Sequence, residues 1–198
     1  LNVSLAKRFF GKQGRWAIAI DPSYISKAGK KTPHIGRFWS GCAQSVKHGL
    51  EIMGIGLVDI DAKDCMMLRA HQSLSNKELS LRNKTMVDFY ISVIKRYRKE
   101  LLKLSTLIVA DAYFSTSTFV NGIKKEGFSL ISRFRDNACL FYVYAGPRTG
   151  KRDRPKTKDG KIDMKNLDLT RMEKMEMKDI EGTAYPLIAY SKALKCKV

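Results

Sequence analysis

Two aspartates, each at the end of an apolar run, are the residues of this 198-residue chain best suited to do chemistry. Asp21 closes the run WAIAI, and Asp111 closes the run LIVA. Short apolar runs rich in isoleucine and valine and closed by turn residues predict buried strands. Pro22 has no N–H to donate, so we expect the first strand to stop at the aspartate.

The elements between the two aspartates predict how they are positioned. Residues 50–61 and 65–68 have the pattern of a strand hairpin, and apolar residues spaced three and four apart predict a helix over 83–104. We expect loops at 22–36 and 73–82, a helix capped by Ser115 and ended by Gly127, and a strand at 128–131. A strand, hairpin, helix, strand order lets the strands before Asp21 and Asp111 lie side by side and parallel, with both carboxylates in one crevice.

Two carboxylates that are forced together repel each other unless a cation lies between them. Mg²⁺ prefers a few carboxylate oxygens together with substrate phosphate, which is the arrangement for metal-assisted cleavage of a phosphodiester. The competing interpretation is that Asp21 and Asp111 are ordinary strand-end residues that cap turns.

The charge of the chain indicates its partner. With 37 Lys and Arg against 19 Asp and Glu, the net charge is +18, which is typical of proteins that bind a polyanion, most often nucleic acid. The candidate DNA-contacting residues are Lys27, Lys30 and Lys31, directly after Asp21, and Arg133 and Arg135, after the strand at 128–131. For all five, a solvated basic surface is the alternative, as it is for the basic stretch 146–160.

Other classes of protein are disfavoured. The sequence has no apolar run of about 18 residues, so we expect no membrane span. The four cysteines are scattered without metal-ligand spacing, which favours free thiols in a reducing cytoplasm over a zinc site.

Several stretches resemble one family. AIDPSYISKAGKKTPHIGRFWSGC (19–42), KHGLEIMGIGLVDID (47–61), LIVADAYFSTSTFV (107–120) and ISRFRDNACL (131–140) are similar to bacterial insertion-sequence transposases of the insertion-sequence-four type, in the DDE superfamily. The resemblance implies an α/β fold: a ribonuclease H-like mixed sheet flanked by helices, with part of a β-rich insertion. It divides the chain into a core at 1–137 and the start of the insertion at 138–198.

The resemblance also implies a site. The family's first two catalytic and metal-binding acids fall on Asp21 and Asp111, which would share a two-metal site for Mg²⁺ or Mn²⁺. The third acid of the family is a glutamate in the pattern Tyr-x2-Arg-x3-Glu-x6-Lys, which does not occur after Asp111. We therefore expect this chain to hold two of three catalytic acids and to be inactive by itself.

The function implied is metal-dependent DNA cleavage and strand transfer at transposon ends, by a homodimer in the bacterial cytoplasm, associated with the nucleoid. The alternatives are a ribonuclease H-like nuclease without strand transfer and a basic nucleic-acid-binding module without catalysis. Two carboxylates beside phosphates favour an enzyme, because a pure binder has no use for them.

Overall fold

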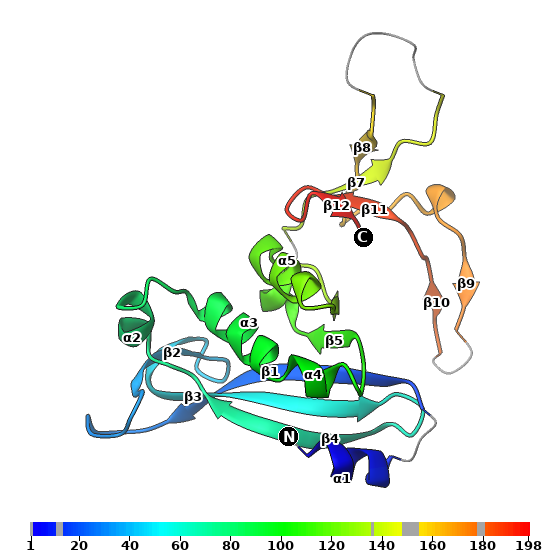
Figure 1. The fold of residues 1–198 in the computed structure, drawn as a ribbon. Helices are drawn as coiled ribbons and strands as arrows, with labels where there is room; N and C mark the ends of the chain where they lie inside the picture. The colour runs from blue at the N-terminus through cyan, green and yellow to red at the C-terminus, as the bar shows by residue number, and fades with distance from the viewer. Residues whose placement is uncertain (1, 11–13, 136, 148–154, 178–180) are drawn as a thin grey trace. The chain divides into compact units, whose positions relative to one another are not determined.

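The computed structural model describes residues 2–10, 14–135, 137–147, 155–177 and 181–198 (Figure 1). The chain divides into two compact units, Leu1–Arg133 and Phe134–Val198. Part of the basic stretch expected at 146–160, residues 148–154, lies outside the described residues. Within the described part of the chain, no helix is both long and apolar enough to cross a membrane.

The first unit is a mixed sheet with helices packed on it. Its elements are α1 (Val3–Phe9), β1 (Trp16–Ser26), β2 (Gly36–Ser40), β3 (Ser45–Asp59), β4 (Asp64–Gln72), α2 (Asn76–Ser80), α3 (Met86–Arg96), α4 (Arg98–Leu101), β5 (Leu107–Ala110), a 3₁₀ turn (Ala112–Phe114), α5 (Ser117–Lys125) and β6 (Ser129–Ser132). The strand order is β2-β3-β1-β5-β6, with β4 also paired to β3. The expected α/β class, a mixed sheet flanked by helices, is confirmed.

The sheet combines antiparallel and parallel pairs. β3 is antiparallel to β1, β2 and β4, whereas β5 is parallel to both β1 and β6. Ile18 pairs with Ile108 and Ala19 with Val109. The sequence prediction that the strands before the two aspartates are adjacent and parallel is confirmed.

The first strand is longer than the sequence predicted, and the expectation that Pro22 ends it is wrong. β1 continues to Ser26 and stays paired with β3, Pro22 lying opposite Met53. The carbonyl of Trp16 accepts a hydrogen bond from Ser105 on the β5 side, and main-chain groups an even number of residues along a strand point the same way. The nitrogen of Pro22 therefore faces the side on which β5 has already ended, so no ladder bond is lost.

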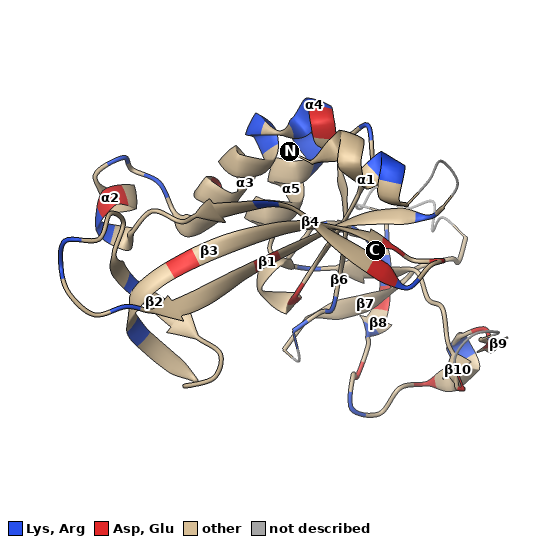
Figure 2. Ribbon diagram, turned by 90° about the horizontal axis from the view of Figure 1, so that it is seen from below, with Lys and Arg blue, Asp and Glu red and all other residues tan. Residues whose placement is uncertain are grey.

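The helices α1, α3, α4 and α5 lie on one side of the sheet (Figure 2). α3 turns its apolar face inward and buries Phe89, Tyr90, Val93 and Ile94 against the sheet. Alternate residues of β3, among them Met53, Ile55 and Leu57, form the other side of the same core. This packing holds the helices against the sheet in which β1 and β5 are neighbours.

Three sequence predictions of helices and loops are corrected. The helix expected at 83–104 is two helices, α3 and α4, separated at Tyr97. The loop expected at 73–82 contains α2, whose start is fixed by reciprocal hydrogen bonds between Ser75 and Glu78. The cap of α5 is Thr116 and not Ser115, while Gly127, with φ of +91°, ends that helix region as expected.

The second unit is built from short strands. Its elements are β7 (Leu140–Val143), β8 (Lys158–Lys161), a 3₁₀ turn (Leu169–Arg171), β9 (Met175–Glu176), β10 (Thr183–Ala184), β11 (Ala189–Ser191) and β12 (Cys196–Lys197). β12-β11-β7-β8 form one antiparallel sheet, and β9 and β10 form a separate pair. This unit has its own small buried cluster, formed by Leu140, Tyr142, Ile162 and Ala189.

Candidate functional site

Asp21 and Asp111 lie at the same place on two neighbouring strands. Asp21 follows Ile20 within β1, and Asp111 directly follows β5. Extending the β1–β5 register by two residues brings Asp21 beside Asp111. Both side chains are exposed, and both line one pocket of about 470 Å³. Their strands thus deliver two carboxylates to one hollow at the carboxyl ends of parallel strands.

Each of these carboxylates keeps one oxygen available. The Ser23 hydroxyl donates to Asp21 Oδ2 at 3.2 Å, and the Tyr113 amide donates to Asp111 Oδ1 at 3.0 Å. No described residue donates to the second oxygen of either carboxylate. Ser132 on β6 donates to the Asp111 carbonyl at 2.7 Å, which fixes the backbone there. Two exposed carboxylates with open oxygens are suitable donors for a hard divalent cation.

The pocket holds a third acid that the sequence analysis did not select. Glu51 on β3 is buried at 8% exposure, and the Tyr90 hydroxyl donates to its Oε1 at 2.6 Å. Burial, followed by the neighbouring Glu51 carboxylate, raises the pKa of Tyr90 far above its usual value, so the hydroxyl stays a donor. The sequence indicates the burial of Glu51, because this residue has the same phase as the buried residues Met53 and Ile55 in the alternating pattern of β3.

Aromatic and polar side chains complete the pocket. Phe38 is buried, whereas its neighbour Trp39 is 58% exposed and Tyr113 is 43% exposed. An aromatic pair such as Phe38 and Trp39 is more often part of the core than of a binding surface, and here this holds for Phe38 but not for Trp39. The remaining lining residues are Pro22, Arg37, Val46, Asn76, Met86 and Phe114. Exposed rings beside carboxylates suit a ligand that has both a flat body and a charge.

The three acids do not form a compact metal cage. Among the described residues, no group of three or more His, Cys, Asp or Glu side chains is close enough together to hold a metal ion. Any cation at Asp21 and Asp111 therefore has few protein ligands and needs other oxygens, such as those of water or a phosphate.

The five basic residues predicted to contact DNA lie outside the aspartate pocket. Lys27, Lys30 and Lys31 are exposed in the loop joining β1 to β2, along which basic residues recur (Figure 2). Arg133 and Arg135 are exposed, but β6 ends at Ser132. Neither arginine belongs to a strand, so the alternation of side chains along β6 does not extend to them. None of these five residues lines the aspartate pocket.

Two other aspartates, Asp59 and Asp61, have structural roles at a hairpin turn. Asp59 accepts hydrogen bonds from the amides of Asp61 and Ala62 and from the Trp16 ring, which together lower its pKa. Hydrogen bonds from the Arg15 side chain and amide lower the pKa of Asp61. Both carboxylates are thus occupied at the β3–β4 hairpin.

No family model matches this chain, and no curated protein or solved structure matches it either.

Proposed function

We propose that this chain is part of a DDE transposase of the insertion-sequence-four type, which cleaves DNA at transposon ends and joins the freed 3′-hydroxyl to target DNA. The observation that supports it most is the convergence of Asp21 and Asp111 at the ends of adjacent parallel strands, on one pocket. The mixed sheet with helices packed on it is compatible with the ribonuclease H-like core that we propose for the first unit.

The donor set fits a divalent metal. Asp21 and Asp111 offer only oxygen atoms and are exposed, and each keeps one oxygen to which no residue in the described ranges donates. Mg²⁺ and Mn²⁺ prefer such ligands, two or three from the protein and the rest from water and phosphate. When bound there, the metal supplies the positive charge that offsets the charge developing on a phosphate under attack.

The residues of this chain have separate roles in the proposed reaction. Asp21 and Asp111 hold the cation and so fix where the scissile phosphate lies. Trp39 and Tyr113 form exposed walls against which the flat faces of nucleotides can pack. Lys27, Lys30 and Lys31 contact DNA phosphates beyond the pocket and hold the duplex in place.

Two other functions are compatible with part of the evidence. A non-catalytic DNA-binding module accounts for the +18 net charge but not for paired, exposed carboxylates, which repel phosphate in the absence of metal. A nuclease without strand transfer uses the same two aspartates. The convergence of Asp21 and Asp111 favours an enzyme over the binding module.

The experiment is a nicking assay on DNA bearing a transposon end, in Mg²⁺, using the protein extended to include the expected glutamate. Asp21→Asn and Asp111→Asn should each abolish nicking, because each removes a cation-binding charge. DNA binding in metal-free buffer should change by less than about two-fold, since neither aspartate attracts phosphate.

Asp64→Asn is the matched control, because Asp64 lies at the start of β4, outside the pocket. It should nick at the unaltered rate. Nicking that persists in both Asp21→Asn and Asp111→Asn would disprove this site. Nicking without joining to target DNA would identify the nuclease alternative, and DNA binding with no nicking under any metal would identify the binding module.

A further inference from the structure

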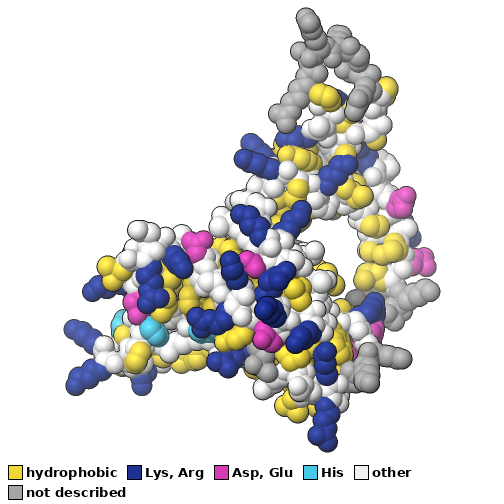
Figure 3. Space-filling view, in the orientation of Figure 1, with side chains coloured by type: hydrophobic (Ala, Val, Ile, Leu, Met, Phe, Trp, Pro, Cys, Tyr) yellow, Lys and Arg dark blue, Asp and Glu magenta, His cyan; other side chains and the backbone are white. Residues whose placement is uncertain are grey.

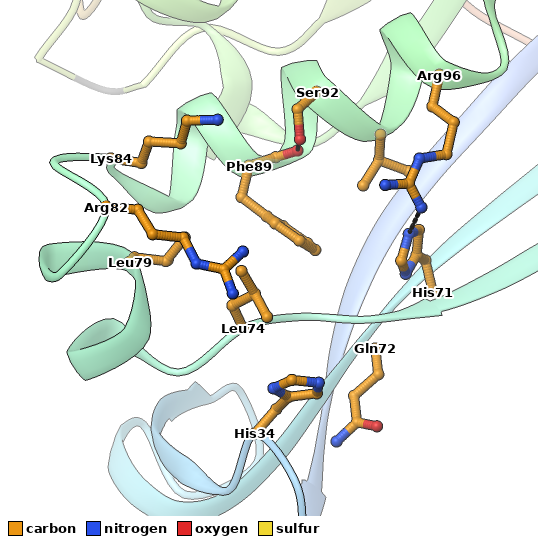
Figure 4. Close-up of a pocket in the computed structure, with 11 residues that line it drawn as sticks. His34, His71, Gln72, Leu74, Leu79, Arg82, Lys84, Phe89, Ser92 and Arg96 are labelled. Carbon is orange, nitrogen blue, oxygen red and sulfur yellow. Dashed lines mark hydrogen bonds between the residues drawn. The ribbon is translucent and has the colours of Figure 1, made fainter.

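A second pocket lies outside the aspartate site, between α2, α3 and the ends of the β1–β2 loop and β4 (Figure 4). Its volume is about 330 Å³, within the range of small-molecule sites. It shares no lining residue with the aspartate pocket, and none of its lining residues is acidic. The lining residues are His34, His71, Gln72, Leu74, Leu79, Arg82, Lys84, Phe89, Ser92, Val93 and Arg96.

Three basic side chains border this pocket without a carboxylate partner. The charged groups of Arg82 and Lys84 form no hydrogen bond or ion pair within 4 Å with another described residue, although the charge of Lys84 helps to lower the pKa of Asp88. Among the described residues, the one hydrogen bond of the Arg96 guanidinium is to the His71 ring, with Nη1 3.5 Å from Nε2. Figure 4 shows Arg82 and Lys84 reaching in from the α2 side and Arg96 from the far end of α3. Figure 3 shows histidine side chains at the surface with basic side chains around them.

The nearby acids do not neutralise these cations. The Glu78 carboxylate is held by the Ser75 amide and hydroxyl and by His34 Nδ1, at 2.7–2.9 Å. The Asp88 carboxylate is held in the same way by Thr85. Burial, followed by the charges of Arg96 and Arg69, lowers the pKa of His71, so the ring itself lies in a positive environment. An anion entering the pocket meets the positive charges of Arg82 and Arg96, and that of Lys84, which Asp88 offsets in part.

The base of the pocket is apolar. Leu79 and Val93 are each 2% exposed and Phe89 is 8% exposed, and the His71 ring packs against Phe89 with centroids 5.8 Å apart. Ser92 and Gln72 add polar groups at the edge. An inorganic anion would contact the basic side chains at the rim but would leave the apolar side chains at the base in contact with water. A ligand with a charged group and a flat organic body uses both.

We propose that this second pocket binds a nucleotide, with its phosphate on Arg82, Lys84 and Arg96 and its base against Phe89, Leu79 and the His71 ring. Arginine and lysine are the usual phosphate ligands, and bases stack on aromatic side chains. The same chemistry belongs to a free nucleoside monophosphate and to the terminal nucleotide of a strand. The inference does not depend on the function proposed for Asp21 and Asp111.

Calorimetric titration of the 198-residue chain tests the proposal. Adenosine monophosphate should bind at least about ten-fold more tightly than adenosine, ribose 5-phosphate or inorganic phosphate, because only the nucleotide uses both the rim and the base. The double variant Arg82→Gln/Lys84→Gln should weaken adenosine monophosphate binding by about ten-fold or more. A 5′-phosphorylated trinucleotide should displace adenosine monophosphate if the pocket binds the end of a strand, and should fail to displace it if the pocket binds a free nucleotide. Either result supports a nucleotide site.

The matched control is Arg8→Gln/Lys99→Gln, which removes the same two charges from exposed positions on α1 and α4. It should change the affinity by less than about two-fold. Arg82 and Lys84 form no hydrogen bond or ion pair with another residue that the structure describes, so the melting temperatures of both double variants should change by only a few degrees. Equal weakening in the two variants would show general attraction to a basic protein and overturn the proposal. Inorganic phosphate binding as tightly as the nucleotide would overturn it too.

Discussion

At the scale of single residues, the hydrogen bond between Tyr90 and Glu51 provides a donor for the buried carboxylate in the aspartate pocket. Both residues are buried, and the hydroxyl lies 2.6 Å from the carboxylate. Tyr90→Phe should lower the free energy of unfolding by about 1–3 kcal/mol, because a buried carboxylate loses its donor while the packing is kept. Urea denaturation with an unchanged m-value measures this loss.

Tyr97→Phe is the control for that variant, since no described residue bonds to its hydroxyl and its ring contact with Arg69 is kept. Its stability should change by less than about 0.5 kcal/mol. A loss of equal size in both variants would show that the Tyr90 hydroxyl contributes nothing through Glu51.

At the scale of elements, the start of α2 predicts a dependence of stability on pH. Hydrogen bonds from Ser75, with a further contribution from His34, lower the pKa of Glu78 from 4.5 to about 2. A carboxyl whose pKa is lower in the folded state stabilises the fold above its unfolded pKa, and this contribution is lost as the pH falls from about 4.5 toward 2. Glu78→Gln should cost about 1 kcal/mol at pH 7 and reduce the loss of stability between pH 5 and 2.

Glu100→Gln is the matched control, because Glu100 is exposed in α4 and no residue that the structure describes bonds to its carboxylate. Its unfolding free energy, measured by denaturation from pH 7 to pH 2, should follow that of the unaltered protein. An acid-induced loss that is the same in Glu78→Gln as in the unaltered protein would contradict the role of this cap.

The elements also show how far sequence reasoning reaches. The two strands before Asp21 and Asp111 were predictable because each has its own local apolar pattern and the order of elements allows parallel neighbours. The cap of α2 was predictable too, since Ser75 and Glu78 have the spacing of a capping box. The continuation of β1 past Pro22 was not, because it depends on which side the proline nitrogen faces and where β5 ends.

The site was predictable to the same extent. Asp21 and Asp111 are marked by position alone, at the ends of apolar runs. Glu51 is marked only by its phase on β3, which a reader of the sequence sees as one acid in an apolar strand. Its partner Tyr90 comes from the helix that packs over that strand, so their contact exists only once the layers are assembled.

At the scale of the whole molecule, the net charge of +18 predicts DNA binding that weakens steeply with salt. Changing Lys27, Lys30 and Lys31 to Ala should weaken binding to every DNA sequence alike. It should also flatten the slope of log affinity against log salt by up to about 2.7, the value for three lost phosphate contacts. Fluorescence anisotropy over a series of salt concentrations measures the slope.

The comparison variant changes three exposed lysines to Ala: Lys7 on α1, Lys99 on α4 and Lys103 in the turn that follows α4. It lowers the net charge equally, so a smaller change in slope is expected if the loop after β1 contacts DNA. Identical slopes for the two triple variants would assign the binding to charge in general and not to that loop.

The pairing of β1 with β5 has a consequence for how the molecule is made. β1 to β4 follow one another along the chain, β2, β3 and β4 are joined by short turns, and β1 pairs with β3 across fewer than 20 intervening residues, whereas Ala19 meets Val109 about 90 residues later. Closing a long segment costs more entropy than closing a hairpin, and contacts between distant residues slow folding. During synthesis, the antiparallel strands are complete before Asp111 has left the ribosome. In the growing chain, Asp21 therefore gains Asp111 as a neighbour only after β5 has been made and has paired with β1.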